Sequence, residues 1–222
     1  MLVGMWMTRD LVTVPPETPI GTVALTMSRR KVRRLLVTES RAGRTCLIGI
    51  VTYNDVAHAF PPDVNPFSVG DWTGIADAQV STIMARRPCT TTPDTPLEEA
   101  ARIMQTRKIG ALPVVRDSSL AGIITESDVF QAFLEMTGVD AGGVRITFDV
   151  GEDEDVIDML TRIGARHGMR LASAWVIRHR EQMSDRYRRL AVVRLLGCET
   201  DALVEDVWRS GHRVISVLRS GR

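Results

Sequence analysis

Residues 49–56 read GIVTYNDV and residues 122–129 read GIITESDV, so one eight-residue pattern occurs twice in the chain. In each copy an apolar run typical of a strand leads into a Thr that is followed three residues later by an Asp. A Thr at the N-cap with an acid at the third helical position forms a capping box, so each copy predicts a strand that runs directly into a helix. A helix start exposes backbone N–H groups and the positive end of the helix dipole, which favours an anion, and the Asp adds a carboxylate able to hold a sugar diol.

The surrounding sequence repeats in register with these two junctions. Positions of the first copy recur with the same or a similar residue 77 positions later, namely Met7, Thr18, Pro19, Ala24, Met27, Arg30, Lys31 and Val32 as Met84, Thr95, Pro96, Ala101, Met104, Arg107, Lys108 and Ile109. From Leu47 onward the offset is 73, because residues 40–46 form a longer turn than residues 117–119. Length changes belong in exposed turns, so we expect two modules of the same fold.

These modules resemble a tandem pair of cystathionine-β-synthase (CBS) domains, a Bateman module, over residues 1–138. Each contains Thr-Val or Thr-Thr near its start, a helix, a strand ending in LPVV or its variant, and the Gly-apolar-apolar-Thr-x-x-Asp pattern. With Thr137-Gly138, the later GHRV at 211–214 and a third domain, the whole chain resembles the acetoin-utilisation AcuB type, in which an ACT-like domain follows two CBS domains.

The predicted fold class is α/β (α+β), a tandem CBS pair with a C-terminal ferredoxin-like domain. We expect CBS domain 1 at residues 1–61, a linker at 62–79, CBS domain 2 at 80–138 and the ACT-like domain at 139–222. In the last domain, apolar and polar residues alternate over 144–150. A helix over 155–167, strands over 171–178 and 187–196, a helix over 200–210 and a strand over 213–218 then complete a βαββαβ order.

The linker is rich in Pro and Gly and shows no sustained periodicity. One interpretation is a surface crossing held down by Phe67 or Trp72. The other makes Trp72 part of a surface for a partner.

Composition describes an ordinary folded protein. The chain is 44% hydrophobic and 25% charged with a net charge of +1, which argues against disorder and against a nucleic-acid footprint. No apolar run reaches the length of a membrane span, and residues 1–7 lack the basic start of a signal peptide. Three scattered Cys without a Cys-x-x-Cys pattern favour a reduced, cytoplasmic protein.

The resemblance implies a nucleotide at each junction. The Thr hydroxyl and helix start, at Thr52 and Thr125, would meet phosphate, while Asp55 and Asp128 would take both ribose hydroxyls. The resemblance also implies a slot for the base in each module, lined by Thr13, Val14, Val32, Arg33 and Arg34 in the first and by Thr90, Thr91, Ile109, Gly110 and Ala111 in the second. The alternative is that each Thr and Asp form a plain capping box that only stabilises a helix.

The two slots differ. Leu36 stands in the first where Pro113 stands in the second, and we expect Arg33 and Arg34 to crowd their own slot. The second slot should therefore have more room for a base. The first should have more charge for phosphate, because residues 29–34 include five cations. Those cations either form a solvated helix end or contact phosphate across the cleft between modules.

The acidic stretch 149–155 is expected to be a helix start rather than a metal site, because it lacks the ligand spacing of a calcium loop. In ACT domains this loop often presents glycine and backbone groups to an amino acid. Gly151 is present, but its acidic neighbours disfavour an amino acid's carboxylate.

No motif for covalent or phosphoryl-transfer chemistry occurs, so we expect no catalytic residues, no catalytic cofactor and no metal. The leading hypothesis is a non-enzymatic sensor of AMP, ADP or ATP, with S-adenosylmethionine or NAD ranked after these. It would relay binding through the ACT-like domain as a homodimer, acting on an unidentified enzyme or regulator in acetoin or carbon catabolism, with neither membrane nor nucleic acid as partner. The rival is an assembly module with vestigial sites, and a third possibility is an uncharacterised hydrolase.

Overall fold

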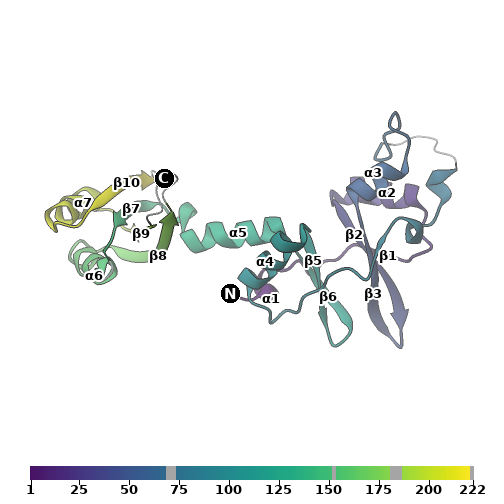
Figure 1. The fold of residues 1–222 in the computed structure, drawn as a ribbon, viewed down its shortest axis with the longest axis horizontal. Coiled ribbons are helices and arrows are strands. Elements are labelled where there is room, and N and C mark those ends of the chain that lie inside the picture. Colours follow the sequence, from purple (N-terminus) through teal and green to yellow (C-terminus); the bar gives the residue numbers. More distant parts are fainter. Residues whose placement is uncertain (69–73, 152–153, 181–186, 221–222) are drawn as a thin grey trace. The chain divides into compact units, whose positions relative to one another are not determined.

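The computed structural model describes residues 1–68, 74–151, 154–180 and 187–220 (Figure 1). By their contacts these residues divide into two compact units, Met1–Val129 and Phe130–Arg222. Trp72 of the linker, and Glu152 and Asp153 of the acidic stretch 149–155, lie outside the described ranges.

The first unit contains the two predicted modules as far as Val129, within α5. The first module consists of β1 (Thr13–Val14), α2 (Ile20–Arg30), β2 (Arg34–Arg41), β3 (Arg44–Thr52) and α3 (Tyr53–Ala59). The second consists of α4 (Leu97–Arg107), β5 (Ala111–Arg116), β6 (Ser119–Thr125) and α5 (Glu126–Thr137). Short α1 (Val3–Trp6), η1 (Ile75–Asp77), η2 (Val80–Thr82) and β4 (Ala85–Arg86) lie before or between them.

Helix α2 shows how the sequence specifies these elements. It starts directly after Pro19 and ends at Lys31, whose φ of 53° closes the helix with a left-handed residue. The apolar side chains on one face of α2 are buried, namely those of Ile20, Val23, Ala24 and Met27. Helix α4 ends in the same way at Lys108, with a φ of 53°, so the repeat extends to backbone conformation.

Strand register repeats as well. Val14 pairs with Val37 in the first module, and Thr91 pairs with Val114 at the equivalent place in the second. The first residue of each hairpin lies opposite the junction Thr: Arg34 pairs with Thr52, and Ala111 with Thr125. The sequence offset of the two modules is therefore a structural equivalence.

The segment that precedes each module packs on the other one. Residues at the chain start bond to the second module, with Val3 N donating to Thr95 O at 2.9 Å and Thr8 bridging to Ile123. Reciprocally, Val80 N donates to Thr18 O at 2.8 Å, and β4 pairs with β3. This exchange explains the glycine of each junction strand. A Cβ on Gly49 would lie 2.5 Å from Met84 Sδ, and one on Gly122 would lie 2.7 Å from Met7 Sδ.

The linker packs on the first module where the structure describes it. The ring of Phe67 stacks on Tyr53 with centroids 3.7 Å apart, and Ala76 in η1 is buried in the core of that module. Within the described ranges, no helix is both long enough and apolar enough to cross a membrane.

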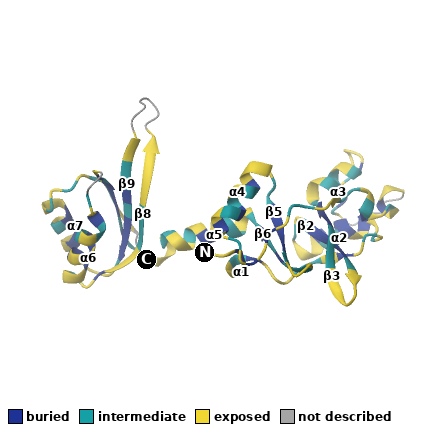
Figure 2. Cartoon of the chain, turned by 60° about the horizontal axis from the view of Figure 1, so that its bottom comes forward, coloured by how far each residue is buried: buried dark blue, intermediate teal, exposed yellow. Residues whose placement is uncertain are grey.

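The second unit is a four-stranded antiparallel sheet in the order β10-β7-β9-β8. Its elements are β7 (Gly143–Asp149), α6 (Val156–Arg166), β8 (Arg170–Arg180), β9 (Tyr187–Leu196), α7 (Thr200–Arg209) and β10 (Val214–Ser220), preceded by η3 (Val139–Ala141). The predicted ferredoxin-like βαββαβ order is confirmed. Helices α6 and α7 lie on one face of the sheet, where the core is buried (Figure 2). Alternate residues along each strand point to the opposite face.

Candidate ligand site

Each strand–helix junction contains a complete capping box. In the first, Asp55 N donates to Thr52 Oγ1 at 3.2 Å, while Asp55 Oδ2 accepts from Thr52 N and Oγ1, both at 2.7 Å. In the second, Asp128 Oδ2 accepts from Thr125 N at 2.8 Å and Oγ1 at 2.7 Å. The predicted caps are therefore formed.

The caps leave part of each carboxylate available. Both bonds to Asp55 and both to Asp128 fall on Oδ2, and Oδ1 of each accepts no hydrogen bond from a described residue. Both Asp side chains are only half-buried. One carboxylate oxygen can accept two hydrogen bonds, so a cis-diol would be held chiefly by Oδ1.

The caps also limit what the helix starts can offer a phosphate. The Thr52 hydroxyl proton is donated to Asp55, so this hydroxyl has only acceptor capacity left. Tyr53 N donates to Arg33 O at 2.9 Å, and Glu126 N donates to Gly110 O at 3.2 Å. Among the described residues, the second helical amide, from Asn54 or Ser127, is the one in each first turn without an acceptor. An anion at either junction would meet this amide first.

The predicted base-slot residues lie close to their junctions along the strands. Thr13 pairs with Leu36, which pairs with Ile50, two positions before the junction Thr52. In the second module Thr91 N donates to Pro113 O at 3.0 Å, and Pro113 pairs with Ile123, two positions before Thr125. Two interstrand spacings of about 4.8 Å each and a two-residue step of about 7 Å along the strand therefore separate each of these residues from its junction Thr.

The Arg34 side chain of the first module reaches the second module. A Cβ on Gly110 would be 2.5 Å from Arg34 Nη2 and 2.9 Å from Glu126 Oε2. The guanidinium of the first module therefore occupies the space beside Gly110 in the second. This contact arises because the hairpins of the two modules pack together through β3 and β6. The expectation that Arg34 crowds its own slot stays a prediction.

The other cations of residues 29–34 are solvated. Arg29, Arg30, Lys31 and Arg33 are exposed, and Arg30 lies 3.8 Å from the exposed Asp10. An exposed pair of this kind adds little stability. These four cations therefore agree with the interpretation of a solvated helix end. Arg34 differs from them because it is half-buried beside Gly110.

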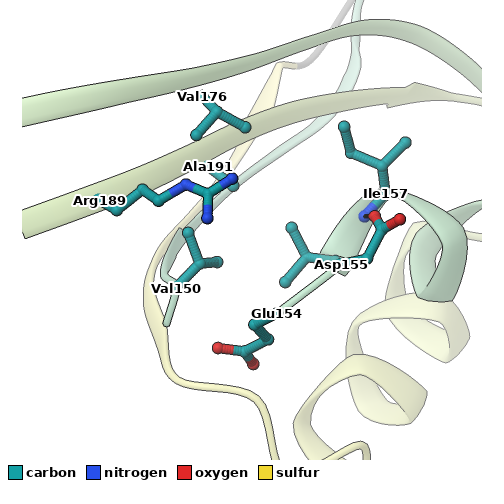
Figure 3. Close-up of a pocket in the computed structure, with 8 residues that line it drawn as sticks. Val150, Glu154, Asp155, Ile157, Val176, Arg189 and Ala191 are labelled. Carbon is teal, nitrogen blue, oxygen red and sulfur yellow. Dashed lines mark hydrogen bonds between the residues drawn. The ribbon is translucent and has the colours of Figure 1, made fainter. Parts of the chain in front are cut away.

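The loop before α6 borders a cavity of about 300 Å³ in the second unit. Figure 3 shows Arg189 reaching toward it from β9, with Glu154 and Asp155 contributed by the loop. Gly151 N donates to Glu154 Oε2 at 2.9 Å, and Gly151 O accepts from Arg189 Nη1 at 3.3 Å. Asp155 Oδ1 caps α6 through the amides of Ile157 and Asp158. The Gly151 N–H, which an amino acid's carboxylate would need, therefore already has an acceptor in Glu154.

The described residues contain no cluster of three or more His, Cys, Asp or Glu side chains that could hold a metal ion. The described acids of the loop instead cap α6 or lie near basic side chains. Glu154 Oε1, for example, is 3.5 Å from His212 Nε2.

Comparison with known proteins identifies the class. The family model of the CBS domain matches residues 3–62 and 80–135, which together are more than half of the chain. The chain therefore belongs to the CBS-domain family, and the matched copies are the two modules of the first unit.

Individual relatives match the same part of the chain. The uncharacterized protein MJ1225 of Methanocaldococcus jannaschii is 36% identical over 132 residues, which are 58% of this chain and 45% of that protein. The chain thus spans less than half the length of this relative.

Two solved structures share the fold. One is a putative acetoin utilization protein (AcuB) from Vibrio cholerae, with a TM-score of 0.52 and 24% identity over 63% of this chain and 95% of that one. The other is the CBS domain pair of protein MJ0100 in complex with 5′-methylthioadenosine and S-adenosyl-L-methionine, with a TM-score of 0.50 and 23% identity over 60% of this chain and 99% of that one.

Proposed function

We propose that the CBS pair binds an adenosine-containing ligand at its two junctions and that the protein is a non-catalytic regulator. The observation that carries this proposal is the free Oδ1 of Asp55 and of Asp128, each half-buried beside a helix start. AMP, ADP and ATP rank first among the ligands, followed by S-adenosylmethionine and NAD. All five carry a ribose diol, whose two hydroxyls can donate hydrogen bonds to the carboxylate.

Phosphate would be held from the helix start and from Arg34. The second junction offers the amide of Ser127, and the Arg34 guanidinium lies beside Gly110 on the same side as Glu126. An Arg fork matches the geometry of phosphate oxygens. The charge of Glu126 opposes an anion there, so we expect a ligand of few phosphates at this junction.

The second junction is also the one continuous with the C-terminal unit. Helix α5 begins at Glu126 and runs to Thr137, beyond the division of the units at Val129. We propose that the C-terminal unit, which we interpret as ACT-like, reads out binding through this helix in a homodimer. The ligand would have to bind one arrangement more tightly than the other, because equal affinity shifts no population.

The alternative function is an assembly module with vestigial sites. One observation favours it: both capping boxes are complete without a ligand, so Thr52, Asp55, Thr125 and Asp128 already have a structural role. In that case no nucleotide would bind. The main role of the pair would be to hold the two modules together through the segments that precede them.

Thermal denaturation of the full chain with AMP, ADP, ATP, NAD and S-adenosylmethionine separates these functions. A ligand at a hundred times its Kd adds about 2.7 kcal/mol, which raises the Tm by several degrees. Asp55→Asn with Asp128→Asn should abolish the shift, because Asn can still accept from the Thr while losing the charged diol acceptor. Asp94→Asn, at an exposed Asp paired with Arg116, is the control.

If none of the five ligands raises the Tm, the chain is an assembly module rather than a sensor. Nucleotide turnover, measured in the same samples, would reveal a hydrolase instead. A role in acetoin or related carbon catabolism is a further part of the proposal, and growth on acetoin of a strain lacking the gene tests it.

A further inference from the structure

The face of the C-terminal sheet opposite α6 and α7 contains a cavity of about 480 Å³. Its lining comes from all four strands, from the C-terminal half of α5 and from η3, and comprises Phe133, Thr137, Val139, Arg145, Ser173, Trp175, Ile177, Val192, Arg194 and Leu218. Most of these side chains are apolar, and none is acidic. A volume of this size is within the range of small-molecule sites.

Two arginines meet in the middle of this lining. Arg145 on β7 and Arg194 on β9 are directly opposite each other in the antiparallel register. Like charges at opposite positions of a sheet repel, and here Arg194 is only 5% exposed. Burial, followed by the charge of Arg145, lowers the pKa of Arg194. The fold thus places two cations together at a point where repulsion destabilises the empty sheet.

The contacts of the two guanidiniums differ. Arg194 donates from Nε to Thr137 O at 3.2 Å and from Nη1 to Gly142 O at 3.0 Å, which fixes it against the end of α5. The Arg145 guanidinium forms no hydrogen bond or ion pair with another described residue. The nearest acid along β7 on this face, Asp149, is engaged by Arg213 at 3.0 Å. Arg145 is therefore available to an anion.

A second polar group in the lining lacks a partner. Nε1 of Trp175 is buried and has no hydrogen-bond acceptor among the described residues. Buried donors in folded proteins are nearly always paired, so an unpaired indole N–H beside a cavity indicates a missing acceptor. The atom itself is covered, so an anion held by Arg145 in the same cavity would meet it after a rotation of the indole ring.

We propose that this cavity binds an amphipathic anion, with its acidic head at Arg145 and Trp175 and its apolar body against Ile177, Val192 and Leu218. A second copy of the chain fits less well. A twofold contact centred here would set the two guanidiniums against the same two of the other copy. The site is independent of the nucleotide proposal, because it lies wholly within the second unit.

Titration calorimetry of the full chain with decanoate, and with decan-1-ol as the uncharged match, tests the proposal. Decanoate should bind about tenfold more tightly than decanol to the wild type. Arg145→Gln should remove this preference, and Trp175→Phe should weaken decanoate about threefold. The controls are Arg209→Gln and Trp208→Phe, which make the same changes at exposed positions of α7. Asp128→Asn should leave decanoate binding unchanged.

A second readout does not require the ligand. Because Arg145→Gln removes the repulsion with Arg194, it should raise the Tm of the ligand-free chain, whereas Arg209→Gln should not. Absence of decanoate binding, equal affinities for decanoate and decanol, or equal effects of Arg145→Gln and Arg209→Gln would each overturn the proposal. So would self-association that Ile177→Glu abolishes in a chain that binds no decanoate, since the face would then be an interface between copies.

Discussion

The two CBS modules have the same order of strands and helices, but the residues around their strand–helix junctions differ. The first junction leads into α3, which ends at Ala59, whereas the second leads into α5, which reaches Thr137 in the other unit. Tyr53 follows the first Thr and stacks on Phe67, while Glu126 follows the second and lies with Arg34 at Gly110. The lesson is that a repeated motif does not make two equal sites, because each module contributes side chains to the other.

The largest expected difference concerns the two junction glycines. A Cβ on Gly122 would lie 2.9 Å from Thr8 O as well as 2.7 Å from Met7 Sδ, whereas one on Gly49 would lie 3.1 Å from Ala85 O and 2.5 Å from Met84 Sδ. A backbone oxygen cannot move aside as a Met side chain can. Gly122→Ala should therefore destabilise the chain by about 3 kcal/mol and Gly49→Ala by about 1 kcal/mol, measured by urea denaturation.

Second-site changes sharpen this test. Met84→Ala should compensate Gly49→Ala, because it removes the only contact shorter than 3.0 Å, while Met7→Ala should leave Gly122→Ala destabilised. Equal compensation at both glycines would mean that Thr8 moves freely and that the two exchanges are equivalent.

Arg34 should affect the second site more than the first, under the proposed nucleotide function. Arg34→Gln should weaken AMP about tenfold in an Asp55→Asn background, where only the second site can bind, and by no more than about twofold in an Asp128→Asn background. Calorimetry measures both, with the exposed Arg29→Gln as the control. A larger loss of AMP affinity at the first site than at the second would mean that Arg34 serves the site of its own module.

The capping boxes should behave alike in the two modules. Thr52→Ala and Thr125→Ala each remove the acceptor for the amide three residues on, at 3.2 and 3.4 Å, and should each cost about 1 kcal/mol of unfolding free energy. Thr→Ser at either position retains the hydroxyl and should cost much less. Markedly unequal costs, measured by chemical denaturation, would show that the surroundings of a junction alter even its local cap.

The smallest expected effect comes from the ion pair of Glu99 and Arg102, which has no equivalent in the first module. Hydrogen bonds from Arg102 at 2.6 and 2.8 Å lower the pKa of Glu99, and the equivalent positions in the first module are Thr22 and Leu25. Because the pKa falls on folding, the pair stabilises the chain above the ordinary Glu pKa and loses this effect as pH falls through the lowered value. Both side chains are solvated, so the gain is small.

Glu99→Gln should accordingly lower the urea midpoint slightly at pH 7, and this difference should shrink as the pH falls through the lowered pKa of Glu99. A difference that does not change with pH would assign the effect to packing instead. Glu98→Gln, at the neighbouring exposed Glu, is the control.

Much of the fold could be predicted because it depends on short-range rules. The Thr-x-x-Asp boxes join residues three apart, and alternation over 144–150 predicted β7. The repeat implied that Met7 and Met84 are equivalent. It did not show that each covers the glycine of the other module, since that depends on how the modules pack.

The amino-acid order by itself determined two capped strand–helix junctions, the ends of the helices and the βαββαβ plan, because hydrogen bonds within a turn and the periods of helix and strand act between near neighbours. Only the tertiary structure decided that Arg34 lies beside Gly110, that one oxygen of each junction carboxylate stays available, and that Arg145 faces Arg194. These depend on contacts between segments far apart in the chain, whose register is set by packing of the whole unit.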